Sequence, residues 1–309
     1  MKILITGVHG FVGSNLVEAL SKEHTIYGLD IVSPIKDGVR FTFSWDFLDK
    51  PDEIPEVDAI IHLAGKAHDT KNQTVSDVYF KVNTGLTQKI YDYFLKSKAK
   101  KFIFFSTAKA AADKVDGILT EDVVPSPVGP YGESKIAAEK YIQEHLVADK
   151  QVYILRPCMI HGPGNKGNLN LLYGVVRKGI PWPLGAFENR RTFTSIGNLC
   201  FVIHGLLTKD VPTGIYNMGD DEALSTNELI EEICKSLDKK AHIWKLPKGL
   251  MNSVAKVGGA LHLPLDSERL RKLTESYISS NAKIKKALGV EKMPVDAREG
   301  LKVTLESFK

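Results

Sequence analysis

Residues 1–13 read MKILITGVHGFVG, a short apolar run that leads directly into three spaced glycines. The run from Lys2 to Thr6 has the length and β-branched content of a buried strand. The stretch from Phe11 to Ser21 carries apolar residues at helical spacing. Glycines 7, 10 and 13 between them permit a tight turn and a close backbone approach, and the helix N-terminus supplies unpaired N–H groups. We therefore expect a strand, a phosphate-binding turn and a helix.

The same alternation of short apolar runs and longer helical patterns continues through the first half of the chain. It predicts βαβ units and an α/β fold with a doubly wound parallel sheet. The predicted strands are Lys2–Thr6, Thr25–Asp30, Ala59–Leu63, Lys101–Ser106 and Gln151–Arg156. The predicted crossover helices are Phe11–Ser21, Asn83–Lys98 and Tyr131–Val147.

After Arg156 the sequence changes to glycine- and proline-rich loops with amphipathic helical patterns at 227–237 and 283–288. This change predicts a smaller C-terminal lobe that binds substrate. We expect a dinucleotide-binding domain over residues 1–160, also taking in roughly 190–220, and a substrate lobe over most of 161–309.

The composition argues against several kinds of partner and site. The 309 residues carry a formal net charge of only +4 and show no basic stripe with interleaved aromatics, so no nucleic-acid partner is expected. Cys158, Cys200 and Cys234 form no CxxC pair and no metal-ligand cluster, so we expect free thiols and no metal. No apolar run is long enough for a membrane span or signal peptide, so a cytoplasmic location without membrane partners is expected.

The second predicted strand ends in Gly28-Leu29-Asp30. A carboxylate there can accept hydrogen bonds from the adenosine ribose hydroxyls and repels a 2′-phosphate. The sequence therefore favours NAD over NADP, although Arg40 on a neighbouring segment could still serve a phosphate.

Tyr131 and Lys135 lie four residues apart in Pro130-Tyr-Gly-Glu-Ser-Lys135, so on a helix they share a face. A nearby cation favours phenolate and lowers a tyrosine pKa, which makes the phenol usable as an acid or base. Thr107 follows another predicted strand and could hydrogen-bond a substrate oxygen. The three residues predict proton transfer coupled to hydride transfer at a hydroxyl carbon.

In this order, the GxxGxxG turn, Asp46-Phe47, His62-Leu63-Ala64-Gly65, Asn83 and the Thr107, Tyr131 and Lys135 set resemble the extended short-chain dehydrogenase/reductase family. The resemblance points to the NAD-dependent epimerase/dehydratase branch and implies a Rossmann sheet. It implies that Asp46-Phe47 contacts adenine and that Asn83 opens a helix. The cofactor residues that it implies are Gly7, Gly10, Phe11, Val12, Gly13, Asp30, Asp46, Phe47, Leu63, Ala64, Gly65, Asn83, Ser106, Tyr131, Lys135 and Pro157.

The second half resembles the substrate lobe of nucleotide-sugar epimerases and 4-ketoreductases. The resemblance implies that Thr107 and Asn168 contact the substrate and that Arg191 grips its diphosphate, a task that suits a guanidinium fork. Arg190 is expected to face solvent, and Arg269 is the candidate for a second phosphate-binding residue.

The resemblance implies a UDP-hexose 4-epimerase acting on UDP-glucose or UDP-GlcNAc. A 4-ketoreductase that makes sugars for surface polysaccharide remains open, and a non-catalytic dinucleotide sensor is a third reading. Dehydratases of this family carry Asp and Glu after the threonine. Ala108 and Lys109 stand here instead, so dehydration is not expected. The family's habit of pairing the helices that begin near Asn83 and Tyr131 implies a homodimer.

Overall fold

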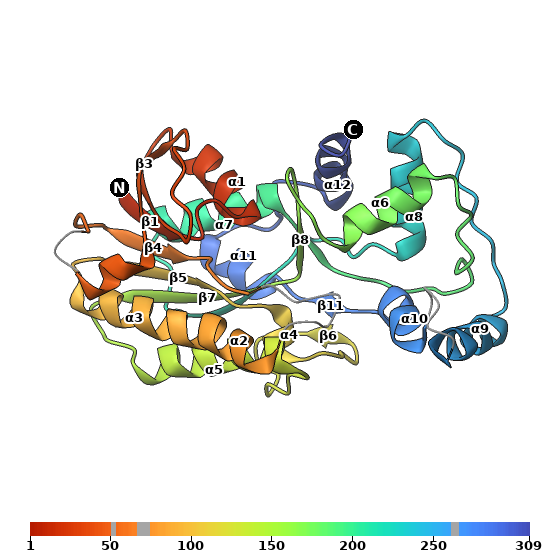
Figure 1. Ribbon diagram of the computed structural model, residues 1–309, viewed down its shortest axis with the longest axis horizontal. Coiled ribbons are helices and arrows are strands. Elements are labelled where there is room, and N and C mark those ends of the chain that lie inside the picture. Colours follow the sequence, from red (N-terminus) through yellow and green to blue (C-terminus); the bar gives the residue numbers. More distant parts are fainter. Residues whose placement is uncertain (51–53, 67–74, 261–265) are drawn as a thin grey trace.

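In the computed structural model, which describes residues 1–50, 54–66, 75–260 and 266–309, the centre of the fold is a seven-stranded parallel sheet (Figure 1). The strand order is β10-β7-β5-β4-β1-β2-β3. The strands are β1 (Lys2–Thr6), β2 (Thr25–Leu29), β3 (Val39–Phe43), β4 (Ala59–His62), β5 (Lys101–Phe105), β7 (Gln151–Pro157) and β10 (Gly214–Met218). The predicted doubly wound parallel sheet is therefore confirmed, and each predicted strand is found to within one residue.

Helices cover both faces of this sheet (Figure 1). Helices α1 (Phe11–Leu20), α7 (Ile196–Thr208) and α11 (Ala282–Leu288) pack on one face, and α3 (Leu86–Lys96) and α5 (Pro130–Glu144) pack on the other. Strand β1 contributes side chains to both faces of the sheet. Ile3 and Ile5 lie in the core under α1, α7 and α11, and Leu4 lies in the core under α3 and α5. Successive strand residues point to opposite faces, so a continuous apolar run suits a strand covered on both sides.

The helix predicted to begin at Asn83 begins at Ser76 instead. It runs through α2 (Ser76–Tyr79), a π-helical turn (Phe80–Gly85) and α3 without a break. The prediction was wrong because Asn83 does not cap this helix but lies buried inside the π-helical turn. Such turns are rare and occur frequently at functional sites.

The other end of the molecule is built around a separate apolar core. Its helices are α6 (Asn168–Arg177), α8 (Thr226–Ser236), α9 (Lys248–Ala260), α10 (Ser267–Thr274) and α12 (Ala297–Glu306). The 3₁₀ turn Trp45–Asp49 follows β3 and packs against the core of the large sheet. The remaining short elements are α4 (Ala108–Ala111), β6 (Ile118–Leu119), β8 (Met159–His161), β9 (Phe193–Ser195) and β11 (Ile278–Ser279). The smaller C-terminal lobe is thus present, whereas the domain boundary at residue 160 stays a prediction. The chain returns to the large sheet with α7, β10 and α11.

None of the helices in the described ranges is long and apolar enough to cross a membrane.

Candidate active site

The glycine-rich turn joins β1 to α1 at the carboxyl edge of the sheet. Gly7 has φ +71°, a conformation that favours glycine, and its N–H donates to Leu29 O at 2.8 Å. A Cβ on Gly13 would lie 2.3 Å from Gly7 O, so only glycine lets the helix approach the turn this closely. Gly10 precedes the first helical turn, which Phe11 and Val12 begin. The residues fit a phosphate cradle, because backbone and a helix N-terminus meet there without side chains.

Asp30 follows β2 and faces this turn. Its Oδ2 accepts from His9 N at 3.0 Å, and its Oδ1 accepts from Ile31 N at 2.7 Å. Two backbone donors therefore fix the carboxylate next to the glycine turn. That position suits recognition of ribose hydroxyls, as expected from the sequence.

We expect Asp30→Ala to weaken NAD binding about tenfold to a hundredfold, the loss of charge-assisted hydrogen bonds. NADP binding should weaken less, because the repulsion of the 2′-phosphate also disappears. Titrating both dinucleotides into stripped protein measures the ratio. Asp30→Asn separates charge from hydrogen bonding, and Asp37→Ala controls for a surface charge. An unchanged NAD-to-NADP ratio in Asp30→Ala contradicts this assignment.

The loop after β4 is held by a buried chain of hydrogen bonds through His62. The Thr87 hydroxyl donates to Asn83 O, so it accepts from His62 Nε2 at 2.9 Å. His62 Nδ1 then accepts from Thr6 Oγ1 at 2.7 Å, and Thr6 Oγ1 accepts from Ala64 N at 3.0 Å. Burial, with Lys135 nearby, holds the pKa of His62 well below its usual value. A neutral imidazole thus fixes the loop of Leu63, Ala64 and Gly65.

Asn83 joins this loop to helix α5. Its Oδ1 accepts from Lys66 N at 2.7 Å, and its Nδ2 donates to Ser134 Oγ at 3.0 Å. A Cβ on Gly65 would lie 2.9 Å from Asn83 Oδ1 and 3.1 Å from Lys135 Nζ. The absence of a side chain on Gly65 therefore lets the loop approach the Asn83 amide and the Lys135 ammonium closely.

Asp46 and Phe47 lie in the 3₁₀ turn after β3. Asp46 is exposed, and Phe47 packs edge-on against Phe43 with ring centroids 4.9 Å apart. Pro157 ends β7 and is buried. The structure thus places Asp46 at the surface near the end of β3, and it gives Phe47 a packing role in addition to the expected adenine contact.

Thr107, Tyr131 and Lys135 converge where β5 ends and α5 begins. Thr107 caps α4, and its hydroxyl is hydrogen-bonded with the Tyr131 phenol. Lys135 Nζ donates to Phe105 O at 2.8 Å and is 95% shielded from solvent. The ring of Tyr79 stands edge-on to Tyr131 at 6.1 Å. The structure therefore brings the three predicted catalytic residues together.

The electrostatics of Tyr131 differ from the expectation. Burial raises the pKa of Tyr131, the hydrogen bond with Thr107 acts to lower it, and Tyr79 adds to the rise. Burial also lowers the pKa of Lys135 to about 8, although Glu139 acts to raise it. The pKa of Tyr131 is therefore raised, not lowered as expected: burial is the largest cause, and the Lys135 ammonium is directed to Phe105 O.

Sequence reasoning missed a buried ion pair behind this set. Arg156 Nη2 lies 2.6 Å from Glu139 Oε2, and both side chains are fully buried. The Ser106 hydroxyl donates to Glu139, so Ser106, expected to contact the cofactor, is committed to this network. Glu139 lies one helical turn after Lys135, and that spacing was the available signal. The pair anchors α5 to β7.

The arginines of the C-terminal lobe separate into two environments. Arg190 is exposed and pairs with Glu228 at 2.8 Å. Arg191 is partly buried and donates through Nη1 to Lys272 O, and burial lowers its pKa, which Cys158 and Glu275 act to raise. Arg191 is thus the inward-facing member of the pair.

The candidate for a second basic residue is less well placed than expected. Arg269 is exposed on α10 and lies 3.6 Å from Asp266. Arg271, two residues later, lies 3.5 Å from Asp113 and acts electrostatically on Arg191. The role of Arg269 in phosphate binding stays a prediction, and Arg271 lies on another face of the same helix. Asn168 is exposed as the first residue of α6.

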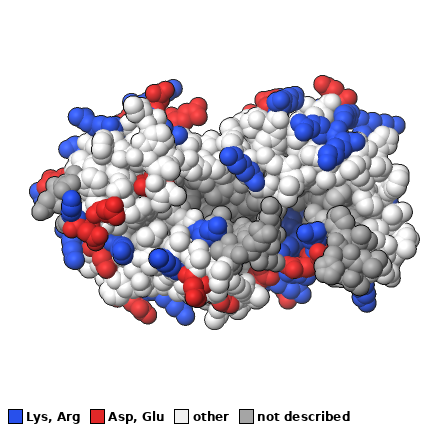
Figure 2. Space-filling model, viewed as in Figure 1, with Lys and Arg blue, Asp and Glu red and all other residues white. Residues whose placement is uncertain are grey.

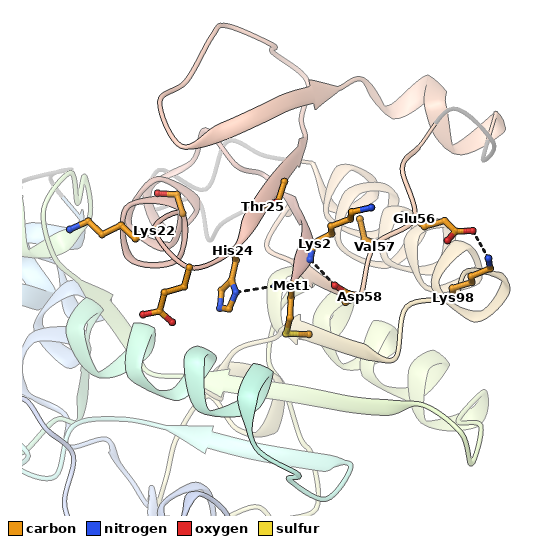
Figure 3. Close-up of a pocket in the computed structure, with 11 residues that line it drawn as sticks. Met1, Lys2, Lys22, His24, Thr25, Glu56, Val57, Asp58 and Lys98 are labelled. Atoms are coloured by element: carbon orange, nitrogen blue, oxygen red, sulfur yellow. Dashed lines mark hydrogen bonds and ion pairs between the residues drawn. The ribbon is translucent and has the colours of Figure 1, made fainter.

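A large charged hollow lies elsewhere, at the amino edge of the sheet (Figure 3). It has a volume of about 640 Å³. Lys98 pairs there with Glu56 at 2.5 Å, and the backbone N–H of Lys2 donates to Asp58 Oδ2 at 2.7 Å. His24 lies at its rim beside α7. Ligands of open α/β sheets bind outside the carboxyl ends of the strands, so the Tyr131 set marks the candidate site and this hollow does not.

Comparisons with known proteins agree with this geometry. Residues 3–219 match the model of the NAD dependent epimerase/dehydratase family. A UDP-glucose 4-epimerase of Vibrio cholerae is 32% identical over 99% of this chain and 95% of its own. An N-acetyl-alpha-D-glucosaminyl-diphospho-ditrans,octacis-undecaprenol 4-epimerase of Escherichia coli O157:H7 is 28% identical over 79% and 75% of the two chains. The solved structure of MoeE5 in complex with UDP-glucuronic acid and NAD superposes with a TM-score of 0.77 at 21% identity, covering 99% and 98%.

Proposed function

Because the chain belongs to the NAD dependent epimerase/dehydratase family, we propose that it is a UDP-hexose 4-epimerase that uses tightly held NAD. The observation that carries the proposal is the Tyr131 phenol, hydrogen-bonded with Thr107 next to Lys135. The Vibrio cholerae relative named UDP-glucose 4-epimerase supports the 4-epimerase assignment, since it aligns over almost the whole chain.

In the proposed reaction, Thr107, Tyr131 and Lys135 each have a separate role. Bound NAD supplies a hydride acceptor that can return the hydride to either face of the sugar. Tyr131 takes the proton of the substrate hydroxyl and later gives it back. Thr107 shares a hydrogen bond with that phenol and orients the substrate oxygen. Lys135 is the cation available to favour phenolate, and with a pKa of about 8 it is mostly protonated at neutral pH.

Dehydration is not part of the proposal. Ala108 and Lys109, directly after Thr107, carry no acid. Asp113 is the next carboxylate along the chain, and it lies 2.8 Å from the Lys109 ammonium. Burial acts to raise the pKa of Asp113, but Lys109 and Arg271 outweigh it and lower the pKa. An acid held ionised in this way cannot protonate a departing hydroxyl at neutral pH.

The cofactor part of the proposal is tested by what the purified protein carries. Heat-denatured protein should release about one dinucleotide per chain, and enzymatic assay of the supernatant should identify it as NAD. A protein that releases none, yet consumes added NADH with a 4-keto sugar nucleotide, is a ketoreductase, and the epimerase proposal then fails.

Arg191 is proposed to grip the diphosphate of the substrate. We expect Arg191→Met to raise KM about tenfold to a hundredfold, the loss of charge-assisted hydrogen bonds, with a smaller change in kcat. Arg190→Met, which removes the exposed neighbour, should change KM less than about threefold, as a surface pair is worth little. Steady-state kinetics on both variants provide the measurement. Equal effects of the two substitutions contradict the assignment.

A further inference from the structure

The segment from Lys239 to Ala260 combines positive charge with exposed apolar side chains. These residues contain five lysines and no acidic residue. Trp244 is 54% exposed, although large apolar side chains are usually buried. The lysines are Lys239, Lys240, Lys245, Lys248 and Lys256, and all of them are exposed.

Helix α9 gives this segment two apolar faces. Met251 and Ala255 are buried in the core of the C-terminal lobe. Leu250, Val254 and Val257 are 51%, 45% and 56% exposed. Their spacing of four and three residues places them in one line along the helix, beside the buried face. The first face explains the attachment of α9, and the described residues leave the second face about half exposed.

The positive charge around α9 is not neutralised by neighbouring acids. Within the described part of the chain, Lys240, Lys245 and Lys256 form no ion pair. The acids of the adjacent helix α10 are engaged: Asp266 lies near Arg269, and Glu268 pairs with Lys272 at 2.6 Å. The surface therefore complements an anionic partner.

This surface is connected to the candidate active site. Helix α9 packs against α10, and the two lie together at the end of the molecule away from the large sheet (Figure 1). At the other end of α10, Lys272 O accepts the hydrogen bond of Arg191. Figure 2 shows both basic and acidic side chains in the middle of the molecule, between the two ends. A partner held on α9 is thus one helix away from the proposed diphosphate grip.

We propose that the outer face of α9, formed by Leu250, Val254 and Val257, docks on an anionic phospholipid surface. Interfacial helices bind by burying an apolar stripe at the headgroup boundary while flanking lysines meet the anionic headgroups. Docking brings Arg191 to a surface where a sugar carried on a lipid diphosphate is held. This assignment of substrate class rests on the proposed function. The Escherichia coli relative, whose name describes such a lipid-linked sugar, is consistent with it.

Vesicle co-sedimentation tests the docking surface. The full-length protein should pellet with vesicles of phosphatidylglycerol and phosphatidylcholine, and much less with phosphatidylcholine alone. Lys245→Glu with Lys256→Glu should weaken binding at least about tenfold, since each lysine near such a surface contributes about fivefold. The triple variant Leu250→Ser, Val254→Ser and Val257→Ser should no longer pellet with the vesicles. Raised salt should weaken binding of the wild-type protein.

A control variant shows whether loss of pelleting is specific to the α9 face. Leu146→Ser with Val303→Ser removes similarly exposed apolar side chains elsewhere, and it should leave pelleting unchanged. Failure of the wild-type protein to bind anionic vesicles, or binding that the α9 substitutions leave intact, overturns the proposal. Light scattering of the triple variant provides a further check. A shift from dimer to monomer also overturns the proposal, because the outer face of α9 is then an interface between two copies of the chain.

Activity measurements on two substrates distinguish a failure of the docking proposal from a failure of the proposed epimerase function. The triple α9 variant should epimerise a water-soluble UDP-sugar at the wild-type rate and lose activity on a lipid-diphosphate sugar in anionic vesicles. Wild-type protein that binds vesicles but converts neither sugar contradicts the proposed function and leaves the docking surface supported. Equal loss on both sugars contradicts the role of α9 in substrate presentation.

Discussion

Tyr131→Phe should lower kcat by about a thousandfold, within the range that a positioned acid or base contributes. The substitution removes only the phenolic oxygen that shares a hydrogen bond with Thr107. The ring remains and still meets Tyr79 edge-on, so the fold and the bound cofactor should be retained. Turnover of a UDP-sugar and the NAD content of the purified variant are the two measurements.

Tyr93→Phe is the matched control, because it removes the hydroxyl of another partly buried tyrosine, on α3. It should keep its full rate. Wild-type kcat in Tyr131→Phe refutes the proton-transfer role. Loss of NAD together with activity shows instead that the phenol acts in cofactor binding.

Lys135→Met should inactivate the protein and yet stabilise it in the cofactor-free state. Burial lowers the pKa of Lys135 to about 8, so the folded chain binds this proton less tightly than the unfolded chain, whose lysine pKa is near 10.4. Below pH 8 the buried ammonium costs the fold about 3 kcal/mol, and this cost disappears as the pH rises from about 8 to about 10.4. The substitution leaves Phe105 O without this donor, which costs about 1–3 kcal/mol, so a net gain of up to about 2 kcal/mol is expected at pH 7.

Urea unfolding of stripped protein at several pH values measures this gain. The advantage of Lys135→Met over wild type should shrink between pH 8 and 10, and exposed Lys140→Met on the same helix should show no such trend. A variant that is less stable than wild type at pH 7, or a difference that does not change with pH, contradicts the account of a buried, costly lysine.

The sequence predicted best the elements whose chemistry is local. The apolar runs of the inner strands and the glycines of the first turn depend on neighbours a few residues away, and the structure contains them as expected. Strand β3 was missed because its residues Val39–Phe43 form an edge that is largely exposed, which breaks the apolar run. Strand β10 was missed because Gly214 and Asn217 interrupt its apolar pattern.

Tertiary contacts decided the rest of the candidate site. No local pattern shows that Asn83 lies inside a π-helical turn, or that Glu139 of α5 pairs with Arg156 of β7. The environment of Arg269 depends on how α10 packs against the rest of the lobe, which periodicity does not specify. The pKa of Tyr131 is raised and not lowered because the phenol is buried, and the extent of that burial cannot be read from the sequence.

The central claim is epimerisation at C4 with a retained cofactor, and proton NMR tests it most directly. Purified protein is incubated with UDP-glucose or UDP-GlcNAc and no added dinucleotide, and the anomeric signals are followed. We expect the signal of the galacto epimer to appear for at least one of these sugars and to grow to an equilibrium ratio. Protein that carries bound NAD and leaves both sugars unchanged contradicts the claim.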